Sequence, residues 1–221
     1  LVEKLVLGCK ILYREGLVSA VGHLSCRIPE SDYILISGQM SPGLVTEEDV
    51  VAINLDGKIV EGTAKLNSEW PIHTEVYRLR PDVKAIAHVH PPYTIILGIV
   101  GETVRPVHNW GATFRDGVGI YHDVAYIRTV EQGRIMAGIL GQRKGVMLRG
   151  HGATVVGNSI EDAVVSSIEM EYNAWLQVEA MKIGQPSYFT PEEAASIVGN
   201  PSRLWQYYAA RATGQIPLQA R

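Results

Sequence analysis

Apolar and polar residues alternate along this chain with two different periods, and the change between them separates helical from extended segments. The opening stretch, LVEKLVLGCKILYREG, repeats its apolar residues at the spacing of one helix face and ends at Gly16. From residue 17 to about residue 60, the apolar segments LSCRI, YILI, VVAIN and KIV alternate with turn sequences such as PESD, SGQMSPG and LDGK. That second pattern predicts strands joined by hairpins.

The middle of the chain mixes both periods. The stretch SEWPIHTEVYRLRPD predicts a helix with Ser68 as its cap and Pro71 in its first turn, and VKAIAHVH after it predicts a buried strand. A short helix over PPYTIILGIVG follows. We then expect strands at GVGIY and VAYIR, a helix over TVEQGRIMAGILG, and strands at GVMLR and ATVV.

The last third of the chain is mainly helical. The longest predicted helix, SIEDAVVSSIEMEYNAWLQVEAMKIG, is capped by Ser159 and ends at Gly184, and Thr190 caps a short helix over TPEEAASIVG. No internal repeat, low-complexity tract or charge block divides the sequence, so we predict a single domain over residues 1–221. Strands flanked and followed by helices predict an α/β layered domain around a mixed or antiparallel sheet.

Composition excludes several classes of function. The 221 residues carry a net charge of −3, which gives no electrostatic footprint for nucleic acid or for an anionic membrane. No apolar run approaches the ~20 residues of a membrane span, and the opening stretch lacks the features of a signal peptide. Cys9 and Cys26 stand in apolar surroundings that suit reduced, buried thiols, so we expect a cytoplasmic protein.

Two of the seven histidines, His88 and His90, stand one residue apart at the end of an apolar strand. Strand residues i and i+2 point to the same face, roughly 7 Å apart, so two imidazoles can converge on one metal ion. His151 lies between two glycines at the junction of two apolar strands and is the natural third ligand. The alternative is a hydrogen-bonded surface pair before the Pro-Pro turn.

Glu69 opens the helix that directly precedes this strand. A carboxylate near three histidines can serve as a fourth ligand or as a general acid/base, whereas many glutamates at a helix start only interact with the helix dipole. His73 follows four residues later on the same helix face. We interpret His73 as a buried structural histidine rather than a ligand.

The combination of these motifs resembles the class II aldolase/adducin family over nearly the whole chain. The resemblance rests on GHLSCR, ISGQMS with LVTEEDVV, the Glu69 helix, the His-x-His strand and LRGHGATVVG. It implies one divalent metal ion per subunit bound by His88, His90 and His151, with Glu69 as the catalytic acid/base. It also implies an α/β/α sandwich around a mostly antiparallel sheet, and a homotetramer with active sites at subunit interfaces.

Departures from the family's sugar-phosphate aldolases bear on the substrate. Those enzymes bind phosphate through a Gly-Asn, a Thr-Gly and a Ser-Ser pair, where this chain has Gly22-His23, Ser37-Gly38 and Asn67-Ser68. An imidazole at position 23 suits a carboxylate or phenolic group better than a neutral amide does. Asn109 also stands where those aldolases tend to carry a tyrosine acid.

The segments GHLSCR, HNWGATF and LRGHG resemble instead the family's decarboxylase branch, which acts on hydroxylated aromatic or pyridine dicarboxylates. We therefore expect a small-molecule carboxylate substrate, Glu69 and His23 as catalytic residues, and Zn²⁺ or Mn²⁺ as cofactor. The expected substrate-binding residues are His23, Ser37, Gly38, Asn67, Ser68 and Arg149.

Other candidates and interpretations stay open at this point. For Arg27 an outward strand position is favoured over a substrate contact, and His108 is favoured over His122 for the pocket. A class II sugar-phosphate aldolase is the alternative activity. A non-catalytic adducin-like module is the third interpretation, and the three retained histidines and Glu69 weigh against it.

Overall fold

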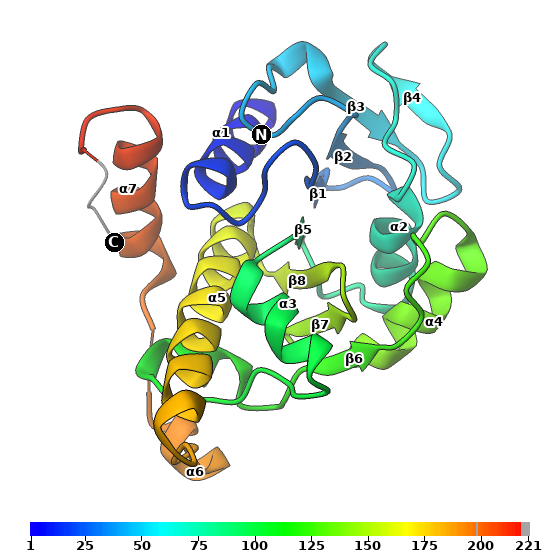
Figure 1. Ribbon diagram of the computed structural model, residues 1–221. Helices are drawn as coiled ribbons and strands as arrows, with labels where there is room; N and C mark the ends of the chain where they lie inside the picture. The colour runs from blue at the N-terminus through cyan, green and yellow to red at the C-terminus, as the bar shows by residue number, and fades with distance from the viewer. Residues whose placement is uncertain (198, 218–221) are drawn as a thin grey trace.

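The computed structural model describes residues 1–197 and 199–217. Its centre is a single eight-stranded sheet in the order β4-β3-β2-β1-β5-β8-β7-β6 (Figure 1). All neighbouring strands are antiparallel except β6 and β7, which run parallel. The strands are β1 (His23–Arg27), β2 (Ile34–Ser37), β3 (Val50–Ile53), β4 (Ile59–Glu61), β5 (Ala85–Val89), β6 (Gly119–Tyr121), β7 (Gly145–Leu148) and β8 (Gly152–Gly157).

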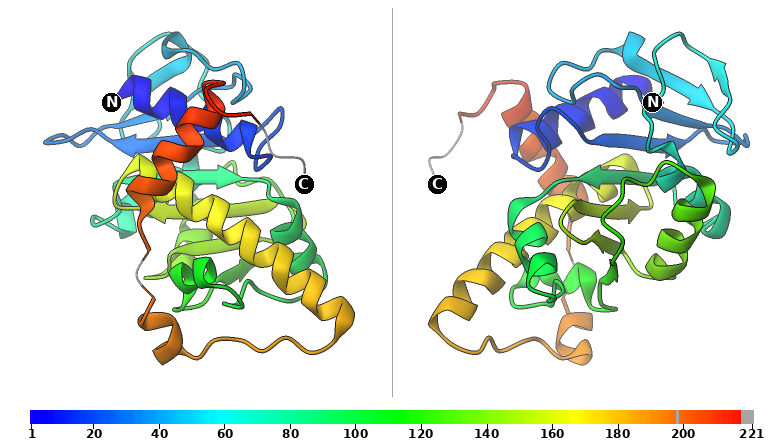
Figure 2. Two further views of the ribbon diagram at one scale, coloured as in Figure 1. Left: turned by 90° about the vertical axis from the view of Figure 1, so that its left-hand side faces the viewer. Right: turned by 45° about the vertical axis from the view of Figure 1, so that its right-hand side comes forward.

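Helices cover both faces of this sheet, which gives the predicted three-layer α/β/α arrangement (Figure 2). One face carries α1 (Val2–Arg14), α3 (Pro92–Ile99), α5 (Ile160–Ile183) and α7 (Pro201–Ala212), and the other carries α2 (Trp70–Leu79) and α4 (Val130–Leu140). The shorter helical segments are η1 (Glu47–Asp49), η2 (Asn109–Phe114) and α6 (Pro191–Ala195).

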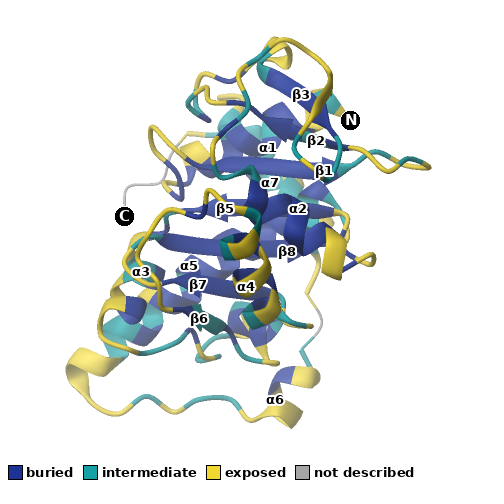
Figure 3. Cartoon of the chain, turned by 90° about the vertical axis from the view of Figure 1, so that its right-hand side faces the viewer, coloured by how far each residue is buried: buried dark blue, intermediate teal, exposed yellow. Residues whose placement is uncertain are grey.

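Alternation along the strands builds two separate apolar cores. In β1, Leu24 and Cys26 pack under α1 and α5, whereas the alternate residues His23 and Ser25 face α2. Successive strand side chains point to opposite faces of a sheet. The central strands are buried on both sides, as the dark blue ribbons of Figure 3 show, so any polar group on their α2 face is enclosed by protein.

A buried carboxylate joins α5 to α3. Glu171 accepts hydrogen bonds from the backbone N–H of Tyr93 at 2.8 Å and from the backbone N–H and hydroxyl of Thr94, each at 3.0 Å. These are free amides of the first turn of α3, where an anion is favoured. Because α3 begins two residues after His90, this contact also holds the end of β5 in place.

Two sequence predictions about local structure are wrong. Ser68 does not cap α2; the helix begins at Trp70 with Glu69 at the cap position, and the Glu69 side chain makes no capping hydrogen bond. The stretch VAYIR, residues 124–128, is a loop rather than a strand, since it pairs with no neighbouring strand.

Other predictions hold. Ser159 and Thr190 cap their helices through the backbone N–H of Asp162 and Glu193. Cys9 and Cys26 are free, buried thiols. Over residues 1–197 and 199–217, none of the helices has the length and apolar character that a membrane crossing requires.

Candidate metal centre and active site

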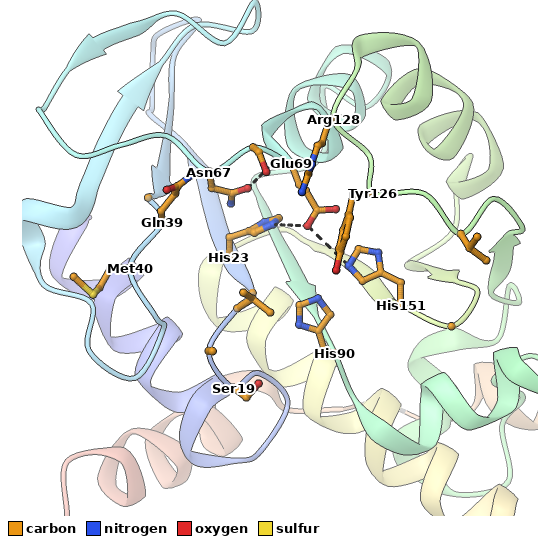
Figure 4. A pocket seen from close by; sticks show the side chains of 17 residues that line it. Ser19, His23, Gln39, Met40, Asn67, Glu69, His90, Tyr126, Arg128 and His151 are labelled. Carbon is orange, nitrogen blue, oxygen red and sulfur yellow. Dashed lines mark hydrogen bonds and ion pairs between the residues drawn. The ribbon is translucent and has the colours of Figure 1, made fainter.

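A cavity of about 780 Å³ opens beside the ends of β1 and β5 (Figure 4). Segments far apart in the sequence form its wall, namely residues 19–23, 38–40 and 67–69, His90, the loop residues Val124, Tyr126 and Arg128, and Gly150 with His151. Volumes of this size are typical of pockets that bind small molecules.

The three predicted metal ligands converge beside this cavity. His88 is the last residue but one of the buried strand β5, His90 follows directly after the strand, and His151 lies in the turn between β7 and β8. Their ring centroids are 4.9 to 5.1 Å apart, and a ligand nitrogen of each lies within 4.8 Å of the others. Strand β5 and the residue directly after it therefore position two of these histidines, and the turn into the antiparallel neighbour β8 brings the third to the same end.

These nitrogens fit a divalent metal ion. Nε2 of His88 and Nε2 of His151 are 3.4 Å apart, and two tetrahedral ligands each about 2.0–2.1 Å from a metal ion lie about 3.4 Å apart. Nδ1 of His90 is buried with no hydrogen-bond partner in the part of the chain that the structure describes. His88 Nδ1 pairs with the Thr154 hydroxyl at 3.2 Å, which leaves Nε2 free as the ligand atom.

Burial keeps these imidazoles in the neutral form that binds metals. Removal from water lowers the pKa of His88 well below its ordinary value, with smaller contributions from His23, His90 and His151. The pKa of His90 and that of His151 are lowered as well, again chiefly by burial. A metal ion therefore needs to displace no proton from these three rings near neutral pH.

Glu69 reaches into the cavity from the start of α2. Its Oε2 lies 3.8 Å from Nε2 of His23 and 3.9 Å from Nε2 of His151. Its backbone N–H donates to Oδ1 of Asn67 at 2.7 Å, which fixes the turn that aims the carboxylate inward. Oε1 is buried and has no hydrogen-bond partner among the described residues.

His23 is 5% exposed and faces Glu69 across the cavity. Burial, with smaller effects of His90 and His151, lowers the pKa of His23 to about 3, so its ring is neutral. A second set of potential ligand atoms belongs to His23, Glu69 and His88, so proximity alone does not identify which residues bind the metal.

Buried polar atoms without partners are concentrated at this cavity. Among the described residues, four buried side-chain atoms that make no hydrogen bond belong to residues of the cavity lining: Nε2 of His23, Nδ2 of Asn67, Oε1 of Glu69 and Nδ1 of His90. Unpaired buried polar atoms are costly and are retained where a ligand satisfies them. The cavity is therefore built to bind a polar group.

Some of the other predicted substrate-binding residues line the cavity, and some do not. Gly38, Asn67 and Ser68 line the cavity, and a Cβ on Gly38 would lie 2.8 Å from the Lys65 carbonyl oxygen. Ser37 is not part of the lining, because its hydroxyl accepts from the Leu24 backbone N–H at 3.1 Å on the other face of β1.

Neither Arg149, the predicted substrate-binding arginine, nor Arg27, for which the sequence favours an outward position, lines the cavity. Arg149 is exposed and donates through Nε to the His122 carbonyl oxygen at 3.0 Å. Arg27 is half-buried rather than outward, and its guanidinium donates to backbone carbonyls of Tyr77 and Val83. His108, which caps η2, and the exposed His122 also lie outside the lining.

Sequence reasoning missed Tyr126 and Arg128, which line the cavity from the loop that we expected to be a strand. Arg128 is the sole lysine or arginine among the described lining residues, and its guanidinium lies 4.9 Å from the Tyr126 ring centroid. The available signal was the alternation of Tyr126 and Arg128 in VAYIR, which we interpreted as a strand.

The family model described as Class II Aldolase and Adducin N-terminal domain matches residues 3–178. The chain belongs to this family. A 3,4-dihydroxyphthalate decarboxylase of Arthrobacter keyseri is 30% identical over 95% of this chain and 92% of its own length. A 5-methylthioribulose-1-phosphate/5-deoxyribulose-1-phosphate aldolase of Rhodospirillum rubrum is 27% identical over 86% and 91%, respectively.

Among solved structures, an L-fuculose 1-phosphate aldolase superposes with a TM-score of 0.82 at 26% identity, covering 89% of this chain and 93% of that one. The family and fold predictions are thus confirmed. These relatives are decarboxylases and aldolases, which both break carbon–carbon bonds, so the prediction of a carbon–carbon lyase is confirmed at the level of reaction class.

Proposed function

We propose that this protein is a divalent-metal-dependent decarboxylase of a hydroxylated aromatic or pyridine dicarboxylate. The observation that carries the proposal is His23, a buried imidazole with an unpartnered Nε2, facing Glu69 in a cavity that also exposes one arginine. Similarity to the dihydroxyphthalate decarboxylase supports the same class of substrate.

The residues of the cavity fit an anionic ring substrate. We assign His88, His90 and His151 as the metal ligands, with either Zn²⁺ or Mn²⁺ as the ion. When bound, the ion supplies a Lewis acid that polarises an oxygen of the substrate. Arg128 is the group suited to a carboxylate, since a guanidinium can donate two parallel hydrogen bonds to it. Nδ2 of Asn67 offers a further buried donor.

Glu69 and His23 divide the chemistry between them. The bond between the ring carbon and the departing carboxylate carbon breaks, and its electron pair stays on the ring. Carbon dioxide leaves, and the ring carbon takes a proton from the Glu69 carboxyl group, which ends as a carboxylate and regains a proton from solvent before the next turnover. Oε1 of Glu69 makes no hydrogen bond among the described residues. His23 holds an anionic oxygen of the substrate beside that carboxyl group.

Product detection tests this assignment. The full chain, loaded with Mn²⁺ or Zn²⁺, is given a panel of ortho-hydroxylated aromatic and pyridine dicarboxylates, and carbon dioxide release is measured. We expect gas from at least one compound, lost in Glu69→Gln and retained in Glu61→Gln, a change at an exposed glutamate of β4. No gas from any compound would contradict the proposal.

A class II sugar-phosphate aldolase is the second candidate. Gly38, Asn67 and Ser68 line the cavity where the family's aldolases bind phosphate, and the similarity to the two aldolases favours this alternative. Aldehyde formed from a ketose 1-phosphate, without carbon dioxide from the panel, would establish it.

We propose further that the protein acts in the cytoplasm as a homotetramer with active sites at subunit interfaces. Apolar side chains stand exposed around the cavity mouth at Val21, Met40 and Val124, which suits coverage by a neighbouring subunit. Light scattering of the purified chain tests this assembly, and a monomer at micromolar concentration would contradict it.

A further inference from the structure

A chain of buried hydrogen bonds runs from His23 away from the cavity. Nδ1 of His23 lies 2.6 Å from Nε2 of His73, and Nδ1 of His73 lies 2.6 Å from the Ser25 hydroxyl. The Ser25 hydroxyl in turn lies 2.9 Å from the Tyr77 hydroxyl. All four side chains are buried, and of the inner three the sequence pattern singles out only His73, as a structural residue.

The protons in this chain have two self-consistent arrangements. In the first, each group donates toward the cavity: Tyr77 to Ser25, Ser25 to Nδ1 of His73, and Nε2–H of His73 to Nδ1 of His23. His23 then carries its own proton on Nε2. In the second, every bond is reversed and His23 presents a bare Nε2. Reversal of one His73 bond alone places two donors or two acceptors face to face at 2.6 Å. An arrangement in which Ser25 accepts from both His73 and Tyr77 leaves the Ser25 proton without an acceptor among the described residues.

The Tyr77 end of this series of hydrogen bonds decides between the two proton arrangements. In the part of the chain that the structure describes, the Tyr77 hydroxyl has one hydrogen-bond partner, Ser25. In the reversed arrangement Ser25 donates to Tyr77, so the phenol proton is buried without an acceptor. Such a donor costs about 1–3 kcal/mol. In the first arrangement the one donor without a protein acceptor is instead the Nε2–H of His23, which lies beside the cavity, 3.8 Å from Oε2 of Glu69, where a ligand can accept from it.

We propose that Ser25 and His73 are positioning residues that fix His23 in its Nε2–H form, with Tyr77 as the terminal donor. In this form Nε2 of His23 cannot coordinate a metal ion, because its lone pair is occupied by the proton. The ligand set of His23, Glu69 and His88 is therefore excluded in favour of His88, His90 and His151.

The same form has a consequence for the substrate, which rests on the proposed function. A neutral N–H donor beside Glu69 binds an anionic oxygen, either carboxylate or phenolate. An asparagine amide would also offer a donor, but one free to rotate to its carbonyl. The hydrogen bond from His73 prevents the equivalent exchange in His23, so this position selects for an acceptor in the ligand.

Nitrogen-15 NMR of the Zn²⁺-loaded full chain, with labelled histidine, tests the proposal without any substrate. Proton-bearing and bare ring nitrogens differ widely in chemical shift, and the signals of His23 are assigned by their loss in His23→Gln. We expect Nε2 of His23 to bear the proton and Nδ1 to be bare, with the same pattern in His73. A proton on Nδ1 of His23 would overturn the proposal.

Variants separate this role from general support of the fold. Ser25→Ala breaks the chain, so we expect the His23 and His73 signals to move to values averaged over both forms. Ser167→Ala is the matched control, because Ser167 is fully buried and its hydroxyl donates within α5, to the Ala163 carbonyl oxygen. Unchanged His23 signals in a folded Ser25→Ala protein would also overturn the proposal.

Kinetics supply an independent readout. With a carboxylate substrate, Ser25→Ala is expected to lower kcat/KM about tenfold, the equivalent of one hydrogen bond of about 1.4 kcal/mol, while bound metal stays stoichiometric. A failure of the decarboxylase assignment would remove this second readout only, because the proton position on His23 is measured in the absence of substrate.

Discussion

His23 and His88 occupy directly opposed positions on two antiparallel strands, and their rings stack with centroids 4.7 Å apart. Thr154 lies opposite His88 on the next strand and pairs with its Nδ1. One row across three strands therefore holds His23, which is proposed to bind the substrate, His88, a proposed metal ligand, and Thr154, which orients the His88 ring. A substitution in this row can change both metal binding and the reaction. Measuring the metal content of each variant separates the two effects.

Removal of one proposed ligand tests the metal centre at this scale. His151→Ala is expected to abolish stoichiometric metal binding and to lower activity by more than the roughly 10- to 100-fold typical of losing an outer-shell partner. His122→Ala is the control, because His122 is exposed nearby and lies outside the cavity lining. Metal content is measured by mass spectrometry after dialysis, and full occupancy in His151→Ala would contradict the assignment.

Arg128 is expected to set affinity for the substrate. Arg128→Ala removes a charge-assisted hydrogen bond worth about 1.5–3 kcal/mol, so KM for a dicarboxylate should rise roughly 10- to 100-fold, with a smaller change in kcat. Steady-state kinetics on the identified substrate measures both constants.

Arg149→Ala distinguishes this assignment from the sequence expectation. Arg149 lies outside the cavity and contacts the His122 carbonyl, so its removal should leave KM nearly unchanged. If Arg149→Ala raises KM and Arg128→Ala does not, the structural assignment of the carboxylate partner is wrong and the sequence expectation is right.

At the scale of elements, the approach of β8 to β5 is limited by Gly152. A Cβ at this position would lie 2.3 Å from the Val89 carbonyl oxygen and 2.9 Å from Cδ2 of His90. Gly152→Ala is therefore expected to separate the two strands, to destabilise the fold by about 1–3 kcal/mol and to weaken metal binding by moving His90. Denaturant unfolding and metal titration measure the two effects.

Gly138→Ala provides the opposite expectation in the same protein. Gly138 is an exposed position of α4, and a Cβ added there would meet no atom of a neighbouring segment within 4 Å. Alanine should therefore stabilise the helix by about 0.5–1 kcal/mol and leave metal binding unchanged. Equal metal affinity in Gly152→Ala and Gly138→Ala would show that the strand contact does not position His90.

The elements predicted correctly from sequence are those whose signals are local. Ser159 caps α5 because the side chain of a cap residue reaches an amide only three residues away, and the apolar run before His88 forms β5 because it is long enough to be buried on both faces. The loop 124–128 has the alternation of a strand, but a strand also needs a neighbour to pair with, and that depends on the whole sheet.

The candidate site divides in the same way. Spacing and resemblance were enough to predict His88, His90, His151 and Glu69. The series of hydrogen bonds from His23 to Tyr77 depends instead on the register between β1 and β5 and on the packing of α2 over both strands. Ser25 and Tyr77 have no sequence signal of their own, since a serine in a strand and a tyrosine in a helix are ordinary. Only their placement beside His73 gives them a role.

At the scale of the whole molecule, the face opposite the metal centre carries a second buried carboxylate, which makes stability depend on pH. Glu169 of α5 accepts a hydrogen bond from the Thr113 hydroxyl at 2.8 Å, and burial raises the pKa of Glu169 from 4.5 to about 7. The folded protein thus holds a proton that the unfolded chain releases, so the contribution of Glu169 to stability is fully present below about pH 4.5 and is lost as the pH rises to about 7.

Glu169→Gln removes this titration and keeps an acceptor for Thr113. The free energy of unfolding of the native chain, minus that of Glu169→Gln, should therefore fall between pH 5 and pH 8 by on the order of 2–3 kcal/mol, because each pKa unit corresponds to about 1.4 kcal/mol. Urea unfolding at several pH values measures the difference, in which groups common to both proteins cancel. A difference that stays constant across this range would mean that Glu169 is solvated in the folded protein and that its carboxylate is charged at neutral pH.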